Sequence, residues 1–432
     1  MLRGVSLLAL GLLAACYRDP SLASCKYRCG GATNESCPSG FDCVSGYCVT
    51  NGDTCREDGG VIDADVPNDA PPDTPLDTPP CVGMGFDTTA LVVGATPRSL
   101  VAYDVDGNTF PDLVVVDNTA AGGAGVFRNM NGTDFDSRVA ISNTTGAVSV
   151  ARGDVDDDNL RDDVFVLKSS TPNTASMRHA VNTGNGTFGG VSFTLSSSNN
   201  PGELAVADID GDGIDDYAVH YLLATHIAFR RHRPLPDDDW KIENDLPIEN
   251  GAKTFTLATI NSGAQIDVVV VYDASDKFMF YSGTSAFQFG SGINQVVGDL
   301  PVDVAVGRLV TTGGLSVVTA NALGDSVSIR HNTGTVSFSS GGDPLTGNEP
   351  VAVILADLNN DQLLDIVTAN KSGNSVSVLL NNGTGFATYV EFPAGAAPID
   401  VVAADFDKDG RMDLAVANSG SNDVSIMYQR CM

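Results

Sequence analysis

An acidic nine-residue pattern recurs at nearly constant intervals through the last three quarters of the chain, and this periodicity restricts the fold more than any other feature. Its clearest copy is DFDKDGRMD at residues 405–413, which places Asp at positions 1, 3, 5 and 9. The first positions of the seven copies, whole or degenerate, are Asp104, Asp154, Asp208, Thr259, Arg308, Asp357 and Asp405. They lie 48 to 54 residues apart, so the sequence predicts a repeat protein with one structural unit per copy.

Each unit contains four short apolar segments that have the length and composition of β-strands. In the sixth unit they are residues 351–356, 366–369 and 376–380 and a segment that begins near Phe386, and the acidic pattern lies between the first two. Seven such units predict an all-β fold, a seven-bladed β-propeller of four-stranded blades. A linear solenoid with the same repeat is the alternative.

The two ends of the repeat region favour the closed propeller over the solenoid. The seventh unit stops after its third strand, residues 424–428, whereas residues 86–93 precede the first unit and resemble a fourth strand. We expect this N-terminal strand to complete the last blade. Aligning it with the fourth strand of the sixth unit places Cys81 in the same turn as Cys431, and we predict a disulfide between these two cysteines that closes the ring.

The acidic pattern indicates a cation site. Four carboxylates at this spacing repel one another unless a cation lies among them, and a set of oxygen ligands suits calcium. An EF-hand is excluded, because position 12 is apolar, as at Val115 and Val416, and no flanking helices are evident. A metal-free network of Asx-turns between the strands is the structural alternative.

The pattern Asp-x-Asp/Asn-x-Asp/Asn-Gly-x-x-Asp, in units of this length, resembles the FG-GAP or VCBS repeats of integrin α-like propellers over about residues 86–432. The resemblance implies about five structural calcium sites, with side-chain ligands at positions 1, 3, 5 and 9 and a backbone carbonyl at position 7. The residues it nominates are Asp104, Asp106, Asn108, Phe110 and Asp112; Asp154, Asp156, Asp158, Leu160 and Asp162; Asp208, Asp210, Asp212, Ile214 and Asp216; Asp357, Asn359, Asp361, Leu363 and Asp365; and Asp405, Asp407, Asp409, Arg411 and Asp413.

Two of the seven units depart from this pattern. The fourth keeps one acid and the fifth keeps none, so we expect neither to bind calcium. Their residues at positions 1, 3, 5 and 9 are Thr259, Asn261, Gly263 and Asp267, and Arg308, Val310, Thr312 and Ser316.

The N-terminus resembles a bacterial lipoprotein. Residues 1–15 combine Arg3 with a short apolar run and read as a signal peptide, and the sequence LAAC at residues 13–16 resembles a lipobox. The resemblance implies that Cys16 is acylated, that residues 16–24 are a lipid-anchored N-terminus, and that the protein lies in the bacterial cell envelope. Tyr17 is not the Asp of the inner-membrane retention signal, which favours the outer membrane. An ordinary signal peptide with an incidental cysteine is the alternative.

Two further segments separate this N-terminus from the repeats at residues 81–432. Residues 25–55 contain six cysteines and too few apolar residues for a core, so we expect a disulfide-rich module in an exported chain. A zinc knuckle is the alternative. Residues 56–80 are rich in acids and proline and read as an extended linker.

One basic segment in the third unit stands out from the acidic background. It contains His220, His226 and His232 at six-residue intervals, together with Arg231 and Trp240. We favour an exposed strand and hairpin without a functional role. The other hypothesis is a site for an anionic sugar, with Trp240 stacked on a ring, in a lectin or a polysaccharide lyase.

Charge and motifs narrow the function. A formal charge of -30 argues against nucleic acid as a partner, and the chain has none of the common hydrolase, metalloprotease or phosphate-binding motifs. We therefore expect a non-enzymatic recognition or adhesion module for a protein or glycan, attached to the membrane only through its lipid. The integrin resemblance implies a ligand face opposite the acidic loops, formed by turns such as 118–125, 168–176, 321–325 and 370–374. A carbohydrate-active propeller and a purely structural envelope protein are the alternatives.

Overall fold

Short antiparallel strands joined by tight turns form nearly all of the described chain. The computed structural model describes residues 41–44, 47–50 and 83–431, apart from 95, 118–121, 155–162, 171–173, 185, 197–199, 223 and 234–238. The chain divides into two compact units, residues 1–64 and 65–432. The predicted signal peptide, Cys16, the predicted linker 56–80, Cys81 and most of the cysteine-rich segment lie outside the described residues. Within the described residues, no helix has the length and apolar character needed to span a membrane.

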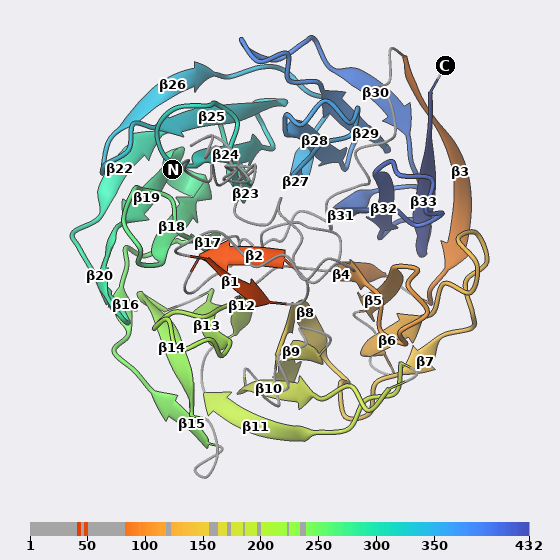
Figure 1. Ribbon diagram of the computed structural model, residues 1–432, viewed down its shortest axis with the longest axis horizontal. Coiled ribbons are helices and arrows are strands. Elements are labelled where there is room, and N and C mark those ends of the chain that lie inside the picture. The colour runs from red at the N-terminus through yellow and green to blue at the C-terminus, as the bar shows by residue number, and fades with distance from the viewer. Residues whose placement is uncertain are drawn as a thin grey trace, which may run out of the picture. The chain divides into compact units, whose positions relative to one another are not determined.

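The described part of the first unit is one antiparallel hairpin, β1 (Phe41–Val44) and β2 (Tyr47–Thr50). The described part of the second unit forms seven sheets of four or five strands around a common axis (Figure 1), besides the two-stranded sheet of β20 (Gly283–Ser285) and β21 (Gln288–Phe289), and this confirms the predicted seven-bladed propeller. Each sheet is a blade, and its strands run outward in chain order from the axis in blades 1 to 6.

The strands of blades 1 to 3 have the following bounds. Blade 1 contains β4 (Pro97–Tyr103), β5 (Asp112–Asp117), β6 (Ala124–Phe127) and β7 (Val139–Ala140). Blade 2 contains β8 (Ala147–Gly153), β9 (Asp163–Ser170), β10 (Thr174–Ala180) and β11 (Val191–Ser196). Blade 3 contains β12 (Pro201–Ala207), β13 (Asp216–Tyr221), β14 (His226–Arg233), β15 (Asp239–Ile242) and β16 (Leu246–Pro247), which also pairs with β14.

The remaining four blades follow the same order. Blade 4 contains β17 (Thr254–Ala258), β18 (Asp267–Tyr272), the short helix η2 (Asp273–Ser275), β19 (Lys277–Tyr281) and β22 (Ile293–Val296), with a hairpin of β20 (Gly283–Ser285) and β21 (Gln288–Phe289) before its last strand. Blade 5 contains β23 (Pro301–Gly307), β24 (Ser316–Asn321), β25 (Ser326–Asn332) and β26 (Phe338–Gly342). Blade 6 contains β27 (Pro350–Ala356), β28 (Asp365–Asn370), β29 (Ser375–Leu379) and β30 (Val390–Pro393). Blade 7 contains β31 (Pro398–Ala404), β32 (Asp413–Asn418), β33 (Asp423–Cys431) and β3 (Met84–Val92).

Blade 7 joins the two ends of the repeat region, as the sequence predicts. Strand β3 pairs antiparallel with β33 over its whole length, from Met84 opposite Cys431 to Val92 opposite Asp423. Cys431 is disulfide-bonded. Its predicted partner, Cys81, lies outside the described residues, so the pairing of these two cysteines stays a prediction.

Apolar side chains fill every interface between neighbouring blades. The second strands of blades 1, 3, 4, 5, 6 and 7 are buried at all six positions, because a neighbouring blade covers each face of their sheets. The buried apolar residues form seven clusters, and each cluster joins two adjacent blades. The inner strands also touch in sequence around the ring, including β31 with β4.

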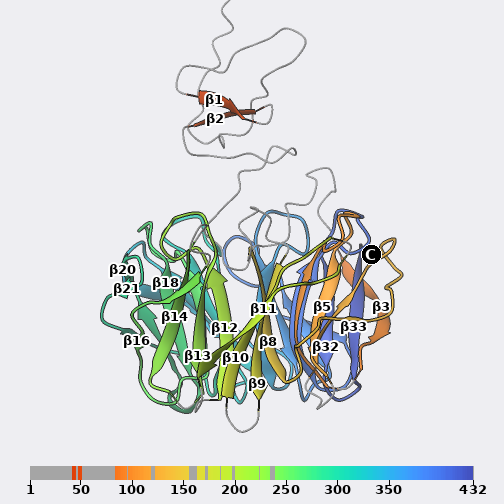
Figure 2. The same cartoon turned by 90° about the horizontal axis from the view of Figure 1, so that it is seen from below.

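Blade topology gives the ring two distinct faces, seen edge-on in Figure 2. The loops between first and second strands and the turns between third and fourth strands lie on one face, which we call the acidic-loop face. The turns between second and third strands and the connections between blades lie on the other, which we call the turn face. Alternating strand direction produces this separation.

A buried polar network holds the turn face in blades 5 to 7. In blade 6, Asn370 Nδ2 donates to Ser375 Oγ (3.1 Å) and Ser377 Oγ (2.9 Å), and its Oδ1 accepts from Thr368 Oγ1 (2.8 Å). Ser377 Oγ also accepts the Gly347 N–H of the connection from blade 5 (2.8 Å). Equivalent bonds surround Asn321, and Asn418 Nδ2 likewise donates to Ser425 Oγ, which accepts the Gly395 N–H.

This network leaves no space for a side chain at the connecting glycine. A Cβ at Gly347 would lie 2.5 Å from Asn370 Nδ2 and 2.8 Å from Glu391 Oε1. We expect Gly347→Ala to lower the free energy of unfolding by about 1–3 kcal/mol, because the buried amide has to move. Gly385→Ala is the matched control, since nothing lies within 4 Å of its Cβ position. Chemical denaturation that gives equal stability for the two variants would contradict this account of the turn face.

Candidate calcium-binding loops

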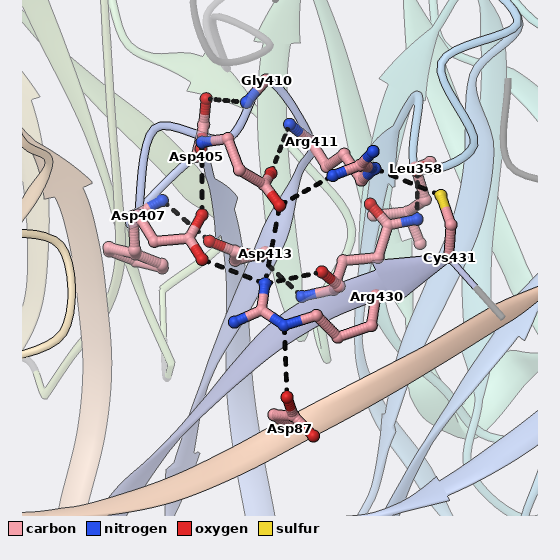
Figure 3. Close-up of polar contacts among 12 residues, drawn as sticks. Asp87, Leu358, Asp405, Asp407, Gly410, Arg411, Asp413, Arg430 and Cys431 are labelled. Atoms are coloured by element: carbon pink, nitrogen blue, oxygen red, sulfur yellow. Dashed lines mark hydrogen bonds and ion pairs between the residues drawn. The ribbon is translucent and has the colours of Figure 1, made fainter. Parts of the chain in front are cut away.

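Each fully described acidic loop is folded by its own carboxylates. In loop 7, residues 405–413, the two oxygens of Asp405 accept the N–H groups of Asp409 (3.1 Å) and Gly410 (3.0 Å). Asp407 Oδ1 accepts Asp409 N–H (3.3 Å), and Asp409 Oδ1 accepts Arg411 N–H (3.0 Å) (Figure 3). The corresponding bonds occur in loops 1, 3 and 6, residues 104–112, 208–216 and 357–365. These Asx-turns aim the side chains of positions 1, 3 and 5 toward the centre of the loop.

The carboxylates at positions 1, 3 and 9 converge in three loops. Their oxygens lie within 4.8 Å of one another in the groups Asp104, Asp106 and Asp112; Asp208, Asp210 and Asp216; and Asp405, Asp407 and Asp413. In loop 6 Asn359 stands at position 3, and its Nδ2 donates to Asp361 Oδ2 (2.9 Å). Three converging carboxylates without a nitrogen or sulfur ligand fit calcium.

The aspartate at position 9 also joins two strands. Asp413 Oδ2 accepts the N–H of Phe406 (2.9 Å), and its Oδ1 accepts the N–H of Gln429 at the end of the third strand (2.7 Å). Asp112, Asp216 and Asp365 accept the corresponding pairs. Asp267 does the same in loop 4, which lacks the other acids. The position 9 carboxylate therefore joins the two strands whether or not the loop carries the other acids.

Burial and mutual repulsion act on these acids. Burial raises the pKa of Asp413 to about 8 and of Asp405 to about 6, backbone hydrogen bonds oppose the shift, and the neighbouring loop carboxylates add to it. Burial is also the main cause at the other position 9 residues, where the pKa rises to about 7 at Asp112, about 8 at Asp216 and about 7 at Asp365. A bound divalent cation would favour the ionised form of each group.

Arginines contact the outer oxygens of loops 3 and 7. Arg430 lies 3.0 Å from Asp407 and 3.2 Å from Asp87 of the closing strand (Figure 3). Arg231 Nε lies 2.5 Å from Asp210 Oδ2. Both arginines lie on the third strand of their blade, and their guanidinium groups offset part of the negative charge of the adjacent loop.

The basic segment of the third unit does not form one exposed surface. His220 is 1% exposed, and Arg231 is held by loop 3. Trp240 is half-buried and stacks on His232, with ring centroids 4.4 Å apart, and it packs against Tyr217 at 4.7 Å. These residues serve the interface between blades 2 and 3 and the frame of loop 3, so the geometry does not favour the hypothesis of a sugar-stacking patch.

Loop 2 differs from the prediction at one position. Asp154 lies at its start, and residues 155–162 are outside the described part of the chain, including the nominated Asp156, Asp158, Leu160 and Asp162. Gly153 pairs with Asp163, whose Oδ1 accepts Asn182 N–H (2.5 Å), as Asp112 accepts Asn129 N–H in blade 1. Loop 2 is one residue longer than the others, so Asp163 and not Asp162 takes position 9.

Loops 4 and 5 contain internal donors in place of acids. Asn261 Nδ2 donates to Asp267 Oδ1 (3.0 Å), and Arg308 Nη1 donates to Gly313 O (3.3 Å). Ser316, at position 9 of loop 5, contacts His331 Nδ1 through its hydroxyl (2.8 Å). Side chains of the protein thus stabilise these two loops.

The sequence patterns did not predict a set of amides that link neighbouring blades. Asn129 Nδ2 donates to Phe406 O of loop 7 (2.9 Å), and Gln429 Nε2 donates to Leu358 O of loop 6 (2.7 Å). Asn182 and Asn381 make the same contact with Val105 O and Leu309 O. The recurrence of Asn at the end of the third strand was the signal available in the sequence.

Comparison with known proteins agrees with the fold and the repeats. An FG-GAP-like repeat model matches residues 157–219 and 357–416. No curated protein matches the chain. Similar solved structures are virginiamycin B lyase from Staphylococcus aureus (11% identity, 80% of this chain and 99% of that chain, TM-score 0.53), BBS1N in complex with ARL6DN (11%, 81% and 96%, 0.57) and the periplasmic gluconolactonase PpgL of Pseudomonas aeruginosa (12%, 73% and 97%, 0.53). At these identities the likeness concerns the fold alone.

Proposed function

Because this chain is a seven-bladed β-propeller that carries FG-GAP-like repeats, we propose that it is a calcium-stabilised module for recognition or adhesion. Calcium would be held by the side chains at positions 1, 3, 5 and 9 of about five loops, with Asp163 at position 9 of loop 2. The ion supplies charge neutralisation and fixes the loop, and the chain does no chemistry on its ligand.

The observation that carries this proposal is that, on the turn face, the buried hydrogen-bond network recurs while the exposed residues of the turns differ. The Asn, Ser and Gly network recurs in blades 5 to 7, yet the residues at the turn tips differ. Leu323 is 71% exposed in blade 5, and Ser372 and Gly420 take its place in blades 6 and 7. Lys371 of blade 6 takes the place of the buried Ala322 of blade 5. A rigid scaffold that presents variable loop residues is typical of a binding surface.

The same face suits a protein or a glycan ligand. Its exposed groups combine hydroxyl and amide side chains with single apolar residues, and the chain is too acidic to attract nucleic acid. We further propose display at the bacterial cell envelope through acylated Cys16, with the acidic linker as a spacer and the outer membrane as the site of attachment.

Binding measurements on tip variants test this proposal. We expect Leu323→Asp combined with Lys371→Glu to abolish glycan-array or envelope-protein binding seen with the full mature chain, without lowering its melting temperature. Val336→Asp is the matched control, because Val336 is a 44% exposed residue on the acidic-loop face of the same blade 5. Binding that survives the tip change and is lost in the control would place the ligand on the other face and contradict the proposal.

A further inference from the structure

A hydrogen-bonded relay connects consecutive acidic loops around part of the ring. In loop 6, Leu358 gives its N–H to Asp365 Oδ2 (3.0 Å) and receives Gln429 Nε2 on its carbonyl (2.7 Å). The N–H of Gln429 in turn binds Asp413 Oδ1 (2.7 Å), which is position 9 of loop 7. One side-chain amide thus links the second residue of loop 6 to a candidate ligand of loop 7.

The relay continues from loop 7 to loop 1. Phe406 gives its N–H to Asp413 Oδ2 (2.9 Å) and receives Asn129 Nδ2 on its carbonyl (2.9 Å). Asn129 N–H then binds Asp112 Oδ1 (2.5 Å), the position 9 residue of loop 1. Asn129 and Gln429 are fully buried, so water does not compete for these bonds.

Packing supports the contact between loop 7 and blade 1. A Cβ at Gly132, in the turn after Asn129, would lie 2.9 Å from the Cα of Asp407. Phe135 and Phe406 meet edge to face at 6.0 Å, and Lys408 Nζ lies 5.2 Å from the ring centroid of Phe110. Loop 7 therefore packs closely against blade 1, so a shift of one displaces the other.

The relay is interrupted at blades 4 and 5. Gly283 takes the equivalent position in blade 4 and has no side chain. Asn332 takes it in blade 5, but its Nδ2 donates to Thr335 O of its own turn (2.6 Å). Asn381 in blade 6 contacts Leu309 O of blade 5 (3.2 Å), so the described relay runs from loop 5 through loops 6, 7 and 1 to Asp163 of blade 2.

We propose that these buried amides couple the calcium loops, so that an ion in one loop raises the calcium affinity of the loop in the next blade. This inference rests on the calcium binding proposed above. An ion in loop 7 fixes the Phe406 peptide, which lies between ligand positions 1 and 3, and Asn129 transfers that order to Asp112. Coupling between two binding sites is reciprocal, so loop 1 acts on loop 7 to the same extent.

Hydrogen–deuterium exchange during a calcium titration tests the coupling loop by loop. Peptides that cover residues 104–112 report the midpoint for loop 1. We expect Asp407→Ala with Asp409→Ala, which disable loop 7 but keep Asp413, to raise that midpoint about fivefold, the low end of typical couplings. In a chain that carries Asn129→Leu, we expect disabling loop 7 to change the calcium midpoint of loop 1 less than twofold. Asn129→Gln keeps an amide donor and should restore part of the effect of loop 7 on that midpoint.

Asn332→Leu is the matched control, because Asn332 occupies the same position in blade 5 but its Nδ2 donates to its own turn. In this variant, disabling loop 7 should still raise the calcium midpoint of loop 1 about fivefold. If Asn129→Leu does not fold, the link between loops 6 and 7 gives the same test. Asn359→Ala with Asp361→Ala then disables loop 6, Gln429→Met removes the linking amide, and peptides that cover residues 405–413 report the midpoint for loop 7. If disabling loop 7 in the otherwise unchanged chain does not change the calcium midpoint of loop 1, the coupling alone is overturned. No calcium-dependent protection in any loop overturns the calcium proposal and the coupling together.

Discussion

We expect chelation with EGTA at pH 8 to lower the midpoint of thermal unfolding by at least about 10 °C. Without the ion, loops 1, 3 and 7 each hold converging acids that are partly buried and repel one another, and burial and the acids of loop 6 raise the pKa of Asp365. A ligand at a hundredfold excess over its dissociation constant contributes about 2.7 kcal/mol per site, so several sites together give a large effect. Differential scanning calorimetry with and without EGTA measures it.

The size of this effect depends on pH. Burial raises the pKa of Asp112 to about 7 and of Asp216 and Asp413 to about 8, above the value near 4 of an unfolded chain. The folded calcium-free chain therefore binds more protons than the unfolded chain between about pH 4 and pH 8, and its stability falls as the pH rises through that window. We expect EGTA to cost more stability at pH 8 than at pH 6. A midpoint that EGTA leaves within about 2 °C at pH 8 contradicts the account.

We expect replacement of Asp413 by Ala to lower the free energy of unfolding by about 3–5 kcal/mol in the presence of calcium. The change removes the acceptor for two buried N–H groups, those of Phe406 and Gln429, and also a candidate ligand of loop 7. Part of the loss should persist in EGTA, because the strand contacts do not need the ion. Urea denaturation in both conditions separates the two contributions.

Asp267→Ala is the matched control for this prediction. Asp267 is fully buried and accepts the same pair of N–H groups, from Ile260 and Gly283, in a loop without the other acids. We expect it to cost about 2–4 kcal/mol with no dependence on calcium. A loss for Asp413→Ala that is the same in calcium and in EGTA would show that Asp413 binds no ion, and a neutral Asp267→Ala would refute the structural role of position 9.

Most of the fold could be predicted from the sequence because each repeat carries its own boundary signals. The interval between acidic patterns gives the number of blades, and the incomplete seventh unit with the extra strand at residues 86–93 predicts the closure by β3 and β33. Strands β27, β28 and β29 lie within a residue of their predicted bounds. Local hydrophobic patterns and turn residues decide these features, so they can be read without long-range contacts.

The parts of the site that escaped prediction depend on contacts between blades or on loop length. Asp162 and Asp163 are adjacent acids, and only the pairing of Gly153 with Asp163 shows which one holds position 9. The amides of Asn129 and Gln429 bond to residues more than 70 positions away in the sequence, so the recurrence of Asn at strand ends does not show what they contact. The surroundings of Trp240 could not be predicted for the same reason, since its ring packs against Phe165 of blade 2 as well as His232 of its own blade.

The calcium content of the purified chain decides whether the acidic loops bind ions. After dialysis against a low-calcium buffer, inductively coupled plasma mass spectrometry combined with a protein concentration gives the number of ions per molecule. We expect about five calcium ions, and about one fewer after Asp407→Ala with Asp409→Ala. A chain that retains no calcium and takes up none at millimolar concentration contradicts this expectation.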